Sequence, residues 1–271
     1  PVPPGFTITC QACMEYYNAT PPAFPEGLDE EIAEHVAALE AKMGKKLGDV
    51  NDPLLVSVRS GSPFSMPGMM DTVLNLGLND ESVKGLIAKS GNERFAWDSY
   101  RRFIQMFSKV VLDVEGDLFE NAITSMRHAR GVENDTDLTA EDLRELVGIF
   151  KRIVAEHVDA AEYPALAVDG SVAFPQDVSV QLHLAIEAVF KSWMNDRAVY
   201  YRKMEKIADD LGTAVNVQAM VFGNMGETSG TGVGFTRNAA DGTKEYYGDF
   251  LTNAQGEDVV AGIRQTRPIA E

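Results

Sequence analysis

The sequence predicts an α+β protein in which strands at both ends enclose a helical subdomain at about residues 95–195. Two short apolar runs near the start, at residues 6–9 and 54–59, have the length and composition of strands. The middle of the chain carries apolar side chains spaced three and four residues apart, which indicates amphipathic helices. Strand-like runs separated by glycine turns follow from residue 215. This order of elements is typical of α+β folds.

The first predicted elements come from local patterns. Residues 6–9 alternate and predict a strand, which a helix up to residue 17 follows. Residues 28–45 predict a second helix, because their apolar side chains fall on one helical face. Residues 54–59 predict a compact strand that ends in a charged residue. A loop rich in glycine and methionine then runs from residue 61 to residue 70.

The middle of the chain predicts further helices with apolar stripes. Thr139 and Asp142 form a capping-box pattern that marks the start of one of them. The segment 163–176 contains three Ala, two Pro and one Gly, and it predicts a surface loop. The predicted stripes, including that of the helix at 28–45, are Ile32, Val36, Leu39 and Met43; Tyr100, Phe103, Phe107 and Val110; Leu143, Leu146, Val147, Phe150 and Val154; Leu182, Ile186, Val189 and Trp193; Tyr201, Met204, Ala208 and Leu211.

The last part of the chain predicts three strands, at residues 215–222, 232–236 and 246–251. Glycine turns separate them at residues 223–224 and 241–242. From these elements we expect three segments, which are residues 1–94, 95–195 and 196–271.

Composition excludes several classes of protein. A net charge of −17 argues against a nucleic-acid binder, because such proteins hold phosphates with clustered Lys and Arg. No apolar run is long enough to span a bilayer, so we expect no membrane association. The start has neither the basic stretch nor the apolar core of a signal peptide. It also lacks an initiator Met, so we expect residues upstream of Pro1, and we expect a cytoplasmic location.

Cysteine and histidine offer few candidate sites. Cys10 and Cys13 have redox-motif spacing, but no further Cys is left to complete a structural zinc site. Two ordinary thiols in a reducing cytoplasm are the alternative. All four histidines (His35, His128, His157 and His183) fall in predicted helices, and none has the context of a nucleophile.

The stretch from residue 54 to residue 72 is the most informative. A strand ending in Arg59 places a permanently charged guanidinium at the margin of a sheet. The loop after it offers hydroxyls and two glycines, Gly61 and Gly68, and such loops let backbone N–H groups converge on an anion. A flexible turn beside a surface arginine explains the same residues equally well.

Two later stretches carry weaker signals. The apolar strand around Gln218 breaks at Gly223, so it could hinge two lobes or present backbone groups to an adenine edge. An antiparallel hairpin with a glycine-rich turn is the alternative. In the stretch 253–262, one of the carboxylates of Glu257 and Asp258 could bind a ribose or reach a metal ion, or the segment could be an exposed turn.

Taken together, these stretches resemble the pyruvate, phosphate dikinase family. The matching segments occur in the family's order over nearly the whole chain, and SMPGMMDT at 65–72 discriminates best. Related phosphoenolpyruvate synthases and rifampicin phosphotransferases are less similar there. The segments are VSVRSG at 56–61, SMPGMMDTVLNLGLN at 65–79, DSYRRFIQM at 98–106, GETSGTG at 226–232 and NAQGEDVVAG at 253–262.

The resemblance implies an ATP-grasp-like fold in which two lobes clamp ATP. In the family, ATP, phosphate and pyruvate become AMP, pyrophosphate and phosphoenolpyruvate through a phosphohistidine on a swivelling domain, with pyruvate bound in a separate barrel. The match puts Arg59 on the transferring phosphates, with Arg102 as a weaker candidate because Arg101 beside it could be the inward one. The other residues that the resemblance assigns to ATP are Ser65, Met66, Gly68, Met69, Asp71 and Thr72 in the phosphate loop, Gln218, Met220 and Val221 at the adenine, and Glu257 at the ribose or metal.

Several parts of the family's site are expected outside this chain. A glycine-rich stretch with a phosphate-binding lysine is expected before Pro1, and the Mg²⁺ ligands are expected beyond residue 271, so no metal ligand is assigned here. The phosphohistidine domain is also expected elsewhere, so the chain alone is expected to be inactive. The alternatives are an ATP-binding module of a phosphoenolpyruvate synthase or water dikinase, and a non-catalytic nucleotide-binding module.

Overall fold

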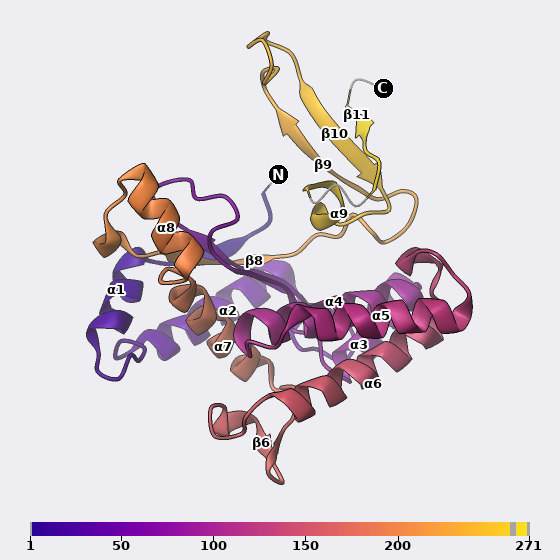
Figure 1. Ribbon diagram of the computed structural model, residues 1–271, viewed down its shortest axis with the longest axis horizontal. Helices are drawn as coiled ribbons and strands as arrows, with labels where there is room; N and C mark the ends of the chain where they lie inside the picture. The colour runs from indigo at the N-terminus through magenta and orange to yellow at the C-terminus, as the bar shows by residue number, and fades with distance from the viewer. Residues whose placement is uncertain (1, 261–263, 270–271) are drawn as a thin grey trace. The chain divides into compact units, whose positions relative to one another are not determined.

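The chain forms two compact units in the computed structural model, residues 1–220 and residues 221–271. The structure describes residues 2–260 and 264–269, except for the side chain of Glu257 (Figure 1). The three predicted segments, with boundaries near residues 95 and 196, do not follow this division, and they stay a prediction. The two units are described separately below.

The centre of the first unit is an antiparallel sheet with the strand order β1-β8-β4-β5. It joins β1 (Gly5–Ile8) at the start of the chain to β8 (Ala214–Ala219) near the end of the unit. Strand β4 (Val56–Gly61) pairs with β8 on one side and with β5 (Thr72–Leu76) on the other. The predicted strand at 6–9 is confirmed within one residue. The strand predicted at 54–59 is divided at Leu55: β3 (Pro53–Leu54) pairs in parallel with β2 (Lys46–Leu47), and β4 continues to Gly61, so Arg59 lies within the strand and not at its end.

The two faces of this sheet differ in polarity, because successive side chains of a strand point to opposite faces. Val58, Val73 and Val217 are paired across three strands, and each is at most 1% exposed. Helices α4 (Glu93–Val111) and α7 (Val178–Ser192) pack on the sheet. Burial of a valine side chain stabilises a fold by about 1.5–3 kcal/mol, so this face holds the sheet on its helices.

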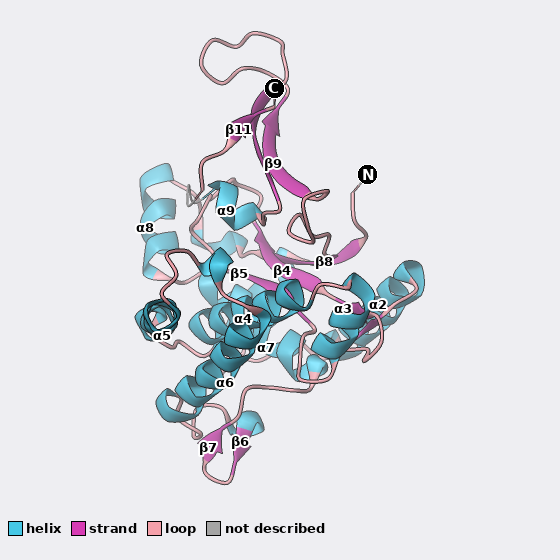
Figure 2. Cartoon of the chain, turned by 90° about the vertical axis from the view of Figure 1, so that its right-hand side faces the viewer, coloured by secondary structure: helices cyan, strands magenta, loops and turns pink. Residues whose placement is uncertain are grey.

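The other helices complete the first unit (Figures 1 and 2). Helices α5 (Gly116–Arg130) and α6 (Ala140–His157) pack with α4, and Phe119 meets Phe150 edge to face with ring centroids 4.8 Å apart. The predicted capping box is confirmed, because the Asp142 backbone N–H donates to Thr139 Oγ1 and the Thr139 N–H to Asp142 Oδ2. The remaining helices are α1 (Cys10–Asn18), α2 (Leu28–Met43) and α3 (Ser82–Ser90), with short 3-10 turns at Asp135–Asp137 and Pro164–Leu166.

The segment 163–176 is largely exposed, as its composition predicts, but it also contributes side chains to the core. It contains a short hairpin of β6 (Ala167–Val168) and β7 (Ser171–Val172), and it delivers Val172 and Phe174 into the core. The Phe174 ring lies 5.5 Å from the rings of Phe103 and Phe107. The proline and alanine content of the segment gave no sign that Leu166, Val172 and Phe174 are core side chains.

The last predicted helical stripe, which runs from Tyr201 to Leu211, is also corrected. Helix α8 (Asp196–Glu205) ends before Ala208 and Leu211, and Met204 is 65% exposed. Lys206 adopts a left-handed φ of 55°, and the fully buried Arg202 binds Asp209 Oδ1 at 2.8 Å and the Trp193 carbonyl at 2.5 Å. These bonds turn the chain back into a 3-10 turn at Asp209–Leu211.

The second unit contains a three-stranded antiparallel sheet with the order β11-β10-β9. Its strands are β9 (Gly230–Phe235), β10 (Tyr247–Thr252) and β11 (Arg267–Pro268), and the short helix α9 (Gly256–Val260) packs on β9 and β10. The predicted strands at 232–236 and 246–251 are confirmed within two residues, whereas the strand predicted to reach residue 222 ends at Ala219.

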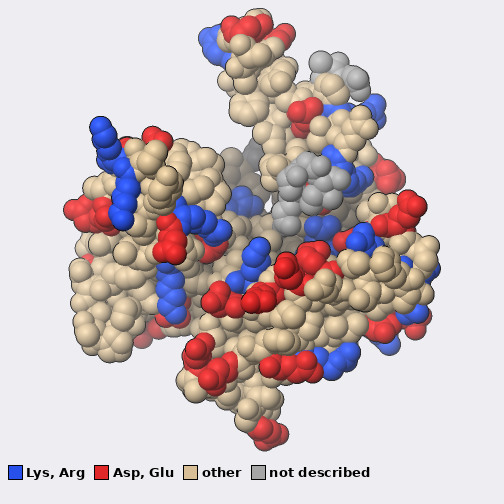
Figure 3. All heavy atoms as spheres, viewed as in Figure 1, with Lys and Arg blue, Asp and Glu red and all other residues tan. Residues whose placement is uncertain are grey.

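Charge is distributed over the surface without segregation on the face that Figure 3 shows. Lys and Arg side chains lie scattered among Asp and Glu side chains over the helices. An excess of carboxylates keeps the net charge at −17.

Candidate functional site

The second face of the four-stranded sheet carries a polar row that crosses every strand. Cross-strand pairing puts Asn216 opposite both Thr7 and Arg59, and Arg59 opposite Thr72. Directly paired residues point to the same face of a sheet, so all four side chains share one side. Arg59 and Thr7 are exposed, and Asn216 and Thr72 are half-buried. The term polar row is used below for Thr7, Asn216, Arg59 and Thr72.

Arg59 is the only charged member of the polar row. Among residues 2–260 and 264–269, no carboxylate forms an ion pair with it. Its neighbour Asn216 is instead occupied by Thr7, whose Oγ1 donates to Asn216 Oδ1 over 2.7 Å. A guanidinium offers five N–H donors in a planar fork that matches phosphate oxygens. The polar row therefore presents an available cation for an anionic ligand.

Two glycines on this face of the sheet leave no room for a side chain. A Cβ at Gly61 would lie 2.6 Å from Asn216 Nδ2, and a Cβ at Gly5 would lie 2.4 Å from the Val217 carbonyl oxygen. Real Cβ atoms do not approach other atoms so closely, so any side chain at these positions displaces its neighbours. Glycine here lets the Asn216 amide lie over the strand and leaves the backbone accessible to a ligand.

The β4–β5 loop, residues 62–71, follows Arg59 and is held on helix α8. Asp71 Oδ2 accepts from Asn195 Nδ2 at 3.0 Å, and Asp71 Oδ1 accepts from Arg197. Arg197 Nε also donates to the Met69 carbonyl at 3.0 Å. Gly68 adopts a left-handed φ of 72° with open space around it, so the loop turns at this residue.

The methionines of this loop enter an apolar cluster, which we call the methionine cluster. Met66 is 7% exposed and is buried with Trp193 and Ala198. The Trp193 ring carries the Arg202 guanidinium 3.9 Å from its centroid, and its Nε1 donates to the Asp209 carbonyl. Partly buried members packed on the cluster are Tyr17, Met69, Met70, Tyr201, Ile207 and Leu211.

Arg102 lies on helix α4 and is engaged by an aspartate. Its Nε donates to Asp98 Oδ2 at 3.0 Å, while the more buried Arg101 donates to Asp98 Oδ1 at 2.6 Å. Burial by itself raises the pKa of the Asp98 carboxyl, but the charges of Arg101 and Arg102 outweigh it and hold that pKa well below its ordinary value. The sequence left open which of the two arginines points inward, and the structure shows that it is Arg101.

The predicted adenine and ribose residues fall at the end of the first unit and in the second. Gln218 shares the face of Asn216, and its Nε2 donates to the Pro3 carbonyl at 2.9 Å. The Met220 sulfur accepts from the Asn75 backbone N–H at 3.0 Å. Val221 is 75% exposed and begins the second unit, and the side chain of Glu257 lies outside the described residues.

Sequence reasoning missed Thr7, Asn216, Asn195 and Arg197. The alternation of Asn216 and Gln218 with buried valines in β8 was a usable signal, because it marks a strand with one polar face. No comparable signal marks Arg197, whose partner Asp71 is 126 residues away in the sequence.

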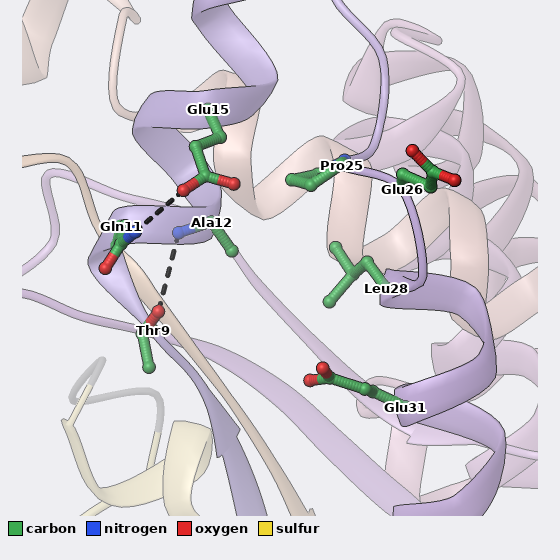
Figure 4. Close-up of a pocket in the computed structure, with 8 residues that line it drawn as sticks. All are labelled: Thr9, Gln11, Ala12, Glu15, Pro25, Glu26, Leu28 and Glu31. Carbon is green, nitrogen blue, oxygen red and sulfur yellow. Dashed lines mark hydrogen bonds between the residues drawn. The ribbon is translucent and has the colours of Figure 1, made fainter.

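A separate hollow lies between α1 and the start of α2, away from every predicted site residue. Its lining includes Thr9, Gln11, Glu15, Glu26 and Glu31 (Figure 4). The Gln11 amide donates to Glu15, and the Thr9 hydroxyl caps the Ala12 N–H, so two of its polar groups are used within α1. The hollow is acidic, which suits neither a phosphate nor a nucleotide.

The cysteines and histidines form no reactive constellation in the described part of the chain. Cys13 is fully buried, and burial raises the pKa of its thiol to about 11, which leaves it protonated near neutral pH. All four histidines lie in helices, as predicted. His35 stacks on Phe6, and His183 Nδ1 lies 3.0 Å from Asp29 Oδ1.

Metal ligands and membrane spans were sought in the same residues. Within 2–260 and 264–269, no three His, Cys, Asp or Glu side chains are grouped to hold a metal ion. Because Mg²⁺ in nucleotide sites is usually held by one or two carboxylates together with the phosphates, the location of its protein ligands beyond residue 271 stays a prediction. Of the helices described, none has the length and apolar character to cross a membrane.

Comparison with known proteins gives one consistent result. Residues 21–269 match the family described as pyruvate phosphate dikinase, AMP/ATP-binding domain. The chain is 55% identical over 271 residues to a pyruvate, phosphate dikinase of Clostridium symbiosum, of which it covers 30%. It is 56% identical to the Giardia intestinalis enzyme over 97% of the chain, and 56% identical to a chloroplastic enzyme of Oryza sativa subsp. japonica over 97% of the chain. It covers 28% and 26% of these two relatives, so it spans less than a third of each protein.

Proposed function

Since the chain belongs to the pyruvate phosphate dikinase AMP/ATP-binding domain family, we propose that it binds ATP on the polar face of the sheet β1-β8-β4-β5. The observation that carries the proposal is Arg59, an exposed guanidinium in a polar row with no carboxylate partner among the described residues. Arg101, Arg130 and Arg197, for example, form ion pairs with carboxylates. The cross-strand partners of Arg59 are instead the neutral side chains of Asn216 and Thr72. Its charge is left for an anionic ligand.

The proposed contacts follow the geometry of this face. Arg59 binds the transferring phosphates. Thr72 is its direct cross-strand partner on β5 and belongs to the same polar row. Ser65, Gly68 and Met69 close over the triphosphate from the β4–β5 loop. Charge-assisted hydrogen bonds to a phosphate each contribute roughly 1.5–3 kcal/mol. Arg102 is a secondary phosphate ligand, because Asp98 already holds it.

The adenine side is proposed from the remaining residues. Gln218 and Met220 at the end of β8, together with Val221, line the adenine, and Glu257 serves the ribose or the metal. These assignments correspond to an ATP-grasp-like fold. Mg²⁺, when bound with ATP, neutralises phosphate charge. Its protein ligands are proposed to lie beyond residue 271.

The chemistry proposed for the whole protein is the ATP-dependent half-reaction of a pyruvate, phosphate dikinase. ATP phosphorylates a histidine on a swivelling domain, and phosphate takes the γ-phosphoryl group, which yields AMP and pyrophosphate. The phosphohistidine then converts pyruvate to phosphoenolpyruvate in a separate barrel. The chain supplies the nucleotide site alone, and a cytoplasmic location is proposed, although several relatives are chloroplastic.

A binding measurement on the chain tests the proposal. Without the upstream lysine and the downstream metal ligands, ATP is expected to bind near or above millimolar (about −4 kcal/mol). Titration calorimetry should show weaker binding for Arg59→Ala and unchanged binding for Arg152→Ala, which removes an exposed arginine of helix α6.

Two outcomes of that titration contradict the proposal. If Arg59→Ala and Arg152→Ala lower the ATP affinity equally, the effect is one of net charge and the polar row is not the site. If a full-length dikinase containing this segment binds ATP no tighter than the chain does, the missing segments are not part of the site.

A further inference from the structure

The β4–β5 loop is fixed to helix α8 by one arginine that binds two of its groups. Arg197 donates to the Asp71 carboxylate and, through Nε, to the Met69 carbonyl at 3.0 Å. Asn195, the residue before the helix, donates to the other Asp71 oxygen at 3.0 Å. Both carboxylate oxygens of Asp71 are thus engaged within the protein.

A second, apolar attachment lies five residues earlier in the same loop. Met66 inserts beside Trp193 and Ala198 in the methionine cluster. Arg202, with its guanidinium over the Trp193 ring and its Nη1 on the Trp193 carbonyl, holds the tryptophan in place. The segment between the two attachments contains Gly68. Its φ of 72° and the open space around it show that the loop turns at this residue.

These attachments end next to the proposed site. Asp71 precedes Thr72, and Thr72 is the direct cross-strand partner of Arg59. A shift of Asp71 therefore shifts the strand end that flanks Arg59. A free carboxylate there would repel a triphosphate, whereas a carboxylate paired with Arg197 does not.

We infer that Asp71 and Arg197 are positioning residues, which set the β4–β5 loop over the proposed ATP site without contacting the nucleotide. This inference rests on the proposed function and assigns Asp71 and Met66 to anchoring instead of ligand contact. Helix α8 becomes the platform on which the phosphate loop is held.

The test measures loop opening and nucleotide use in the same variants of a full-length dikinase containing this segment. Phe64 is 51% exposed in the loop, so chymotrypsin cleavage after Phe64, followed by mass spectrometry, reports opening. Asp71→Ala and Arg197→Ala are each expected to speed this cleavage by about 1.4-fold to fivefold, the range for loss of an exposed ion pair. The double variant is expected to exceed each single variant by less than the product of the two effects, because both single variants already lose the shared bond between Asp71 and Arg197.

Activity separates positioning from a merely structural effect. Both single variants should raise KM for ATP in the ATP-dependent half-reaction, leave the phosphoenolpyruvate-dependent half-reaction unchanged, and keep the melting temperature. Arg197→Lys should recover part of the effect, since an ammonium can pair with Asp71 but cannot reproduce the second fixed bond to Met69. Lys203→Ala, which removes an exposed cation from the same helix, is the matched control and should match the wild type.

Three results overturn the inference. The cleavage rate could stay constant in both single variants, or the two effects could add in the double variant. Alternatively, Arg197→Ala could weaken ATP binding while Asp71→Ala tightens it, which would make Arg197 a direct phosphate ligand. Failure of the proposed function looks different: ATP neither binds the wild type nor slows the Phe64 cut, while the Asp71 and Arg197 variants still open the loop.

Discussion

In helix α4, the Arg101 guanidinium lies 2.6 Å from the Asp98 carboxylate, and their side chains are only 5% and 8% exposed. Arg102 adds a second cation to the same carboxylate at 3.0 Å. Breaking a buried pair is more costly than its net contribution, because the remaining charge is left without a partner. Asp98 is therefore the residue that allows two adjacent arginines to lie side by side in helix α4.

The Asp98→Asn variant is expected to lower the free energy of unfolding at pH 7 by about 3 kcal/mol. The pKa of Asp98 is lower in the folded protein than its unfolded value of about 3.9. Its contribution is thus present above about pH 4 and is lost as the pH falls toward the folded pKa. Urea unfolding from pH 7 to pH 3.5 should show the difference between wild type and variant shrinking below about pH 4.

The control for this experiment is Asp210→Asn, at an exposed aspartate. Its unfolding curve should follow the wild type at neutral pH. A difference between Asp98→Asn and wild type that stays constant down to pH 3.5 would show that the ion pair is not the source of the effect.

Phe174→Ala is expected to destabilise the fold by roughly 3–5 kcal/mol, the usual cost of truncating a buried phenylalanine. Phe174 is 3% exposed and meets three aromatic rings, those of Tyr100, Phe103 and Phe107. Phe64→Ala, at a residue that is 51% exposed, should change the free energy of unfolding by no more than about 0.5 kcal/mol. Equal effects of the two variants on the free energy of unfolding would show that Phe174 does not contribute to the core.

Features that depend on neighbouring residues could be predicted from the sequence, whereas those that depend on tertiary contacts could not. The capping box at Thr139 and the existence of a strand at Arg59 were predictable, because both depend on residues close in sequence. The end of α8 was not, since it depends on Arg202 reaching Asp209 and the Trp193 carbonyl after the chain has folded. Tertiary contacts of this kind override the helical spacing of Ala208 and Leu211.

The site shows the same division. Arg59 and Gly68 stood out as members of a strand-and-loop pattern. The attachment of Asp71 to Arg197 did not, because 126 residues separate them and neither position is unusual by itself. The order of the strands, which brings Thr7 and Asn216 beside Arg59, also follows from pairing that no single segment encodes.

The chain by itself should not accept a phosphoryl group from ATP. His35 stacks on Phe6 with ring centroids 5.5 Å apart, and His183 is held by Asp29, so neither has the setting of an acceptor. Incubation with radiolabelled ATP, followed by a search for acid-labile phosphate, should leave all four histidines unmodified. Label on His35, His128, His157 or His183 would contradict the assignment of the acceptor to another domain.

Arg59→Ala should slow formation of the phosphohistidine in a full-length dikinase far more than it weakens ATP binding. A guanidinium aimed at the moving phosphoryl group gains interaction as charge redistributes in the transition state, whereas ground-state ATP keeps its other contacts. Loss of such a group costs about three to five decades in rate in phosphoryl transfer. Rapid-quench measurement of the labelled histidine at saturating ATP gives this rate directly.

Two further variants and one half-reaction decide whether Arg59 is catalytic or structural. Arg59→Lys should recover only part of the rate, since a point charge cannot reproduce a bidentate fork, and Arg152→Ala should match the wild type. Phosphorylation of the histidine by phosphoenolpyruvate uses no ATP, so it should proceed normally in Arg59→Ala. Because Arg59 is exposed, its removal should also leave the melting temperature unchanged. Equal losses in both half-reactions, or a lower melting temperature, would make Arg59 a structural residue of the sheet.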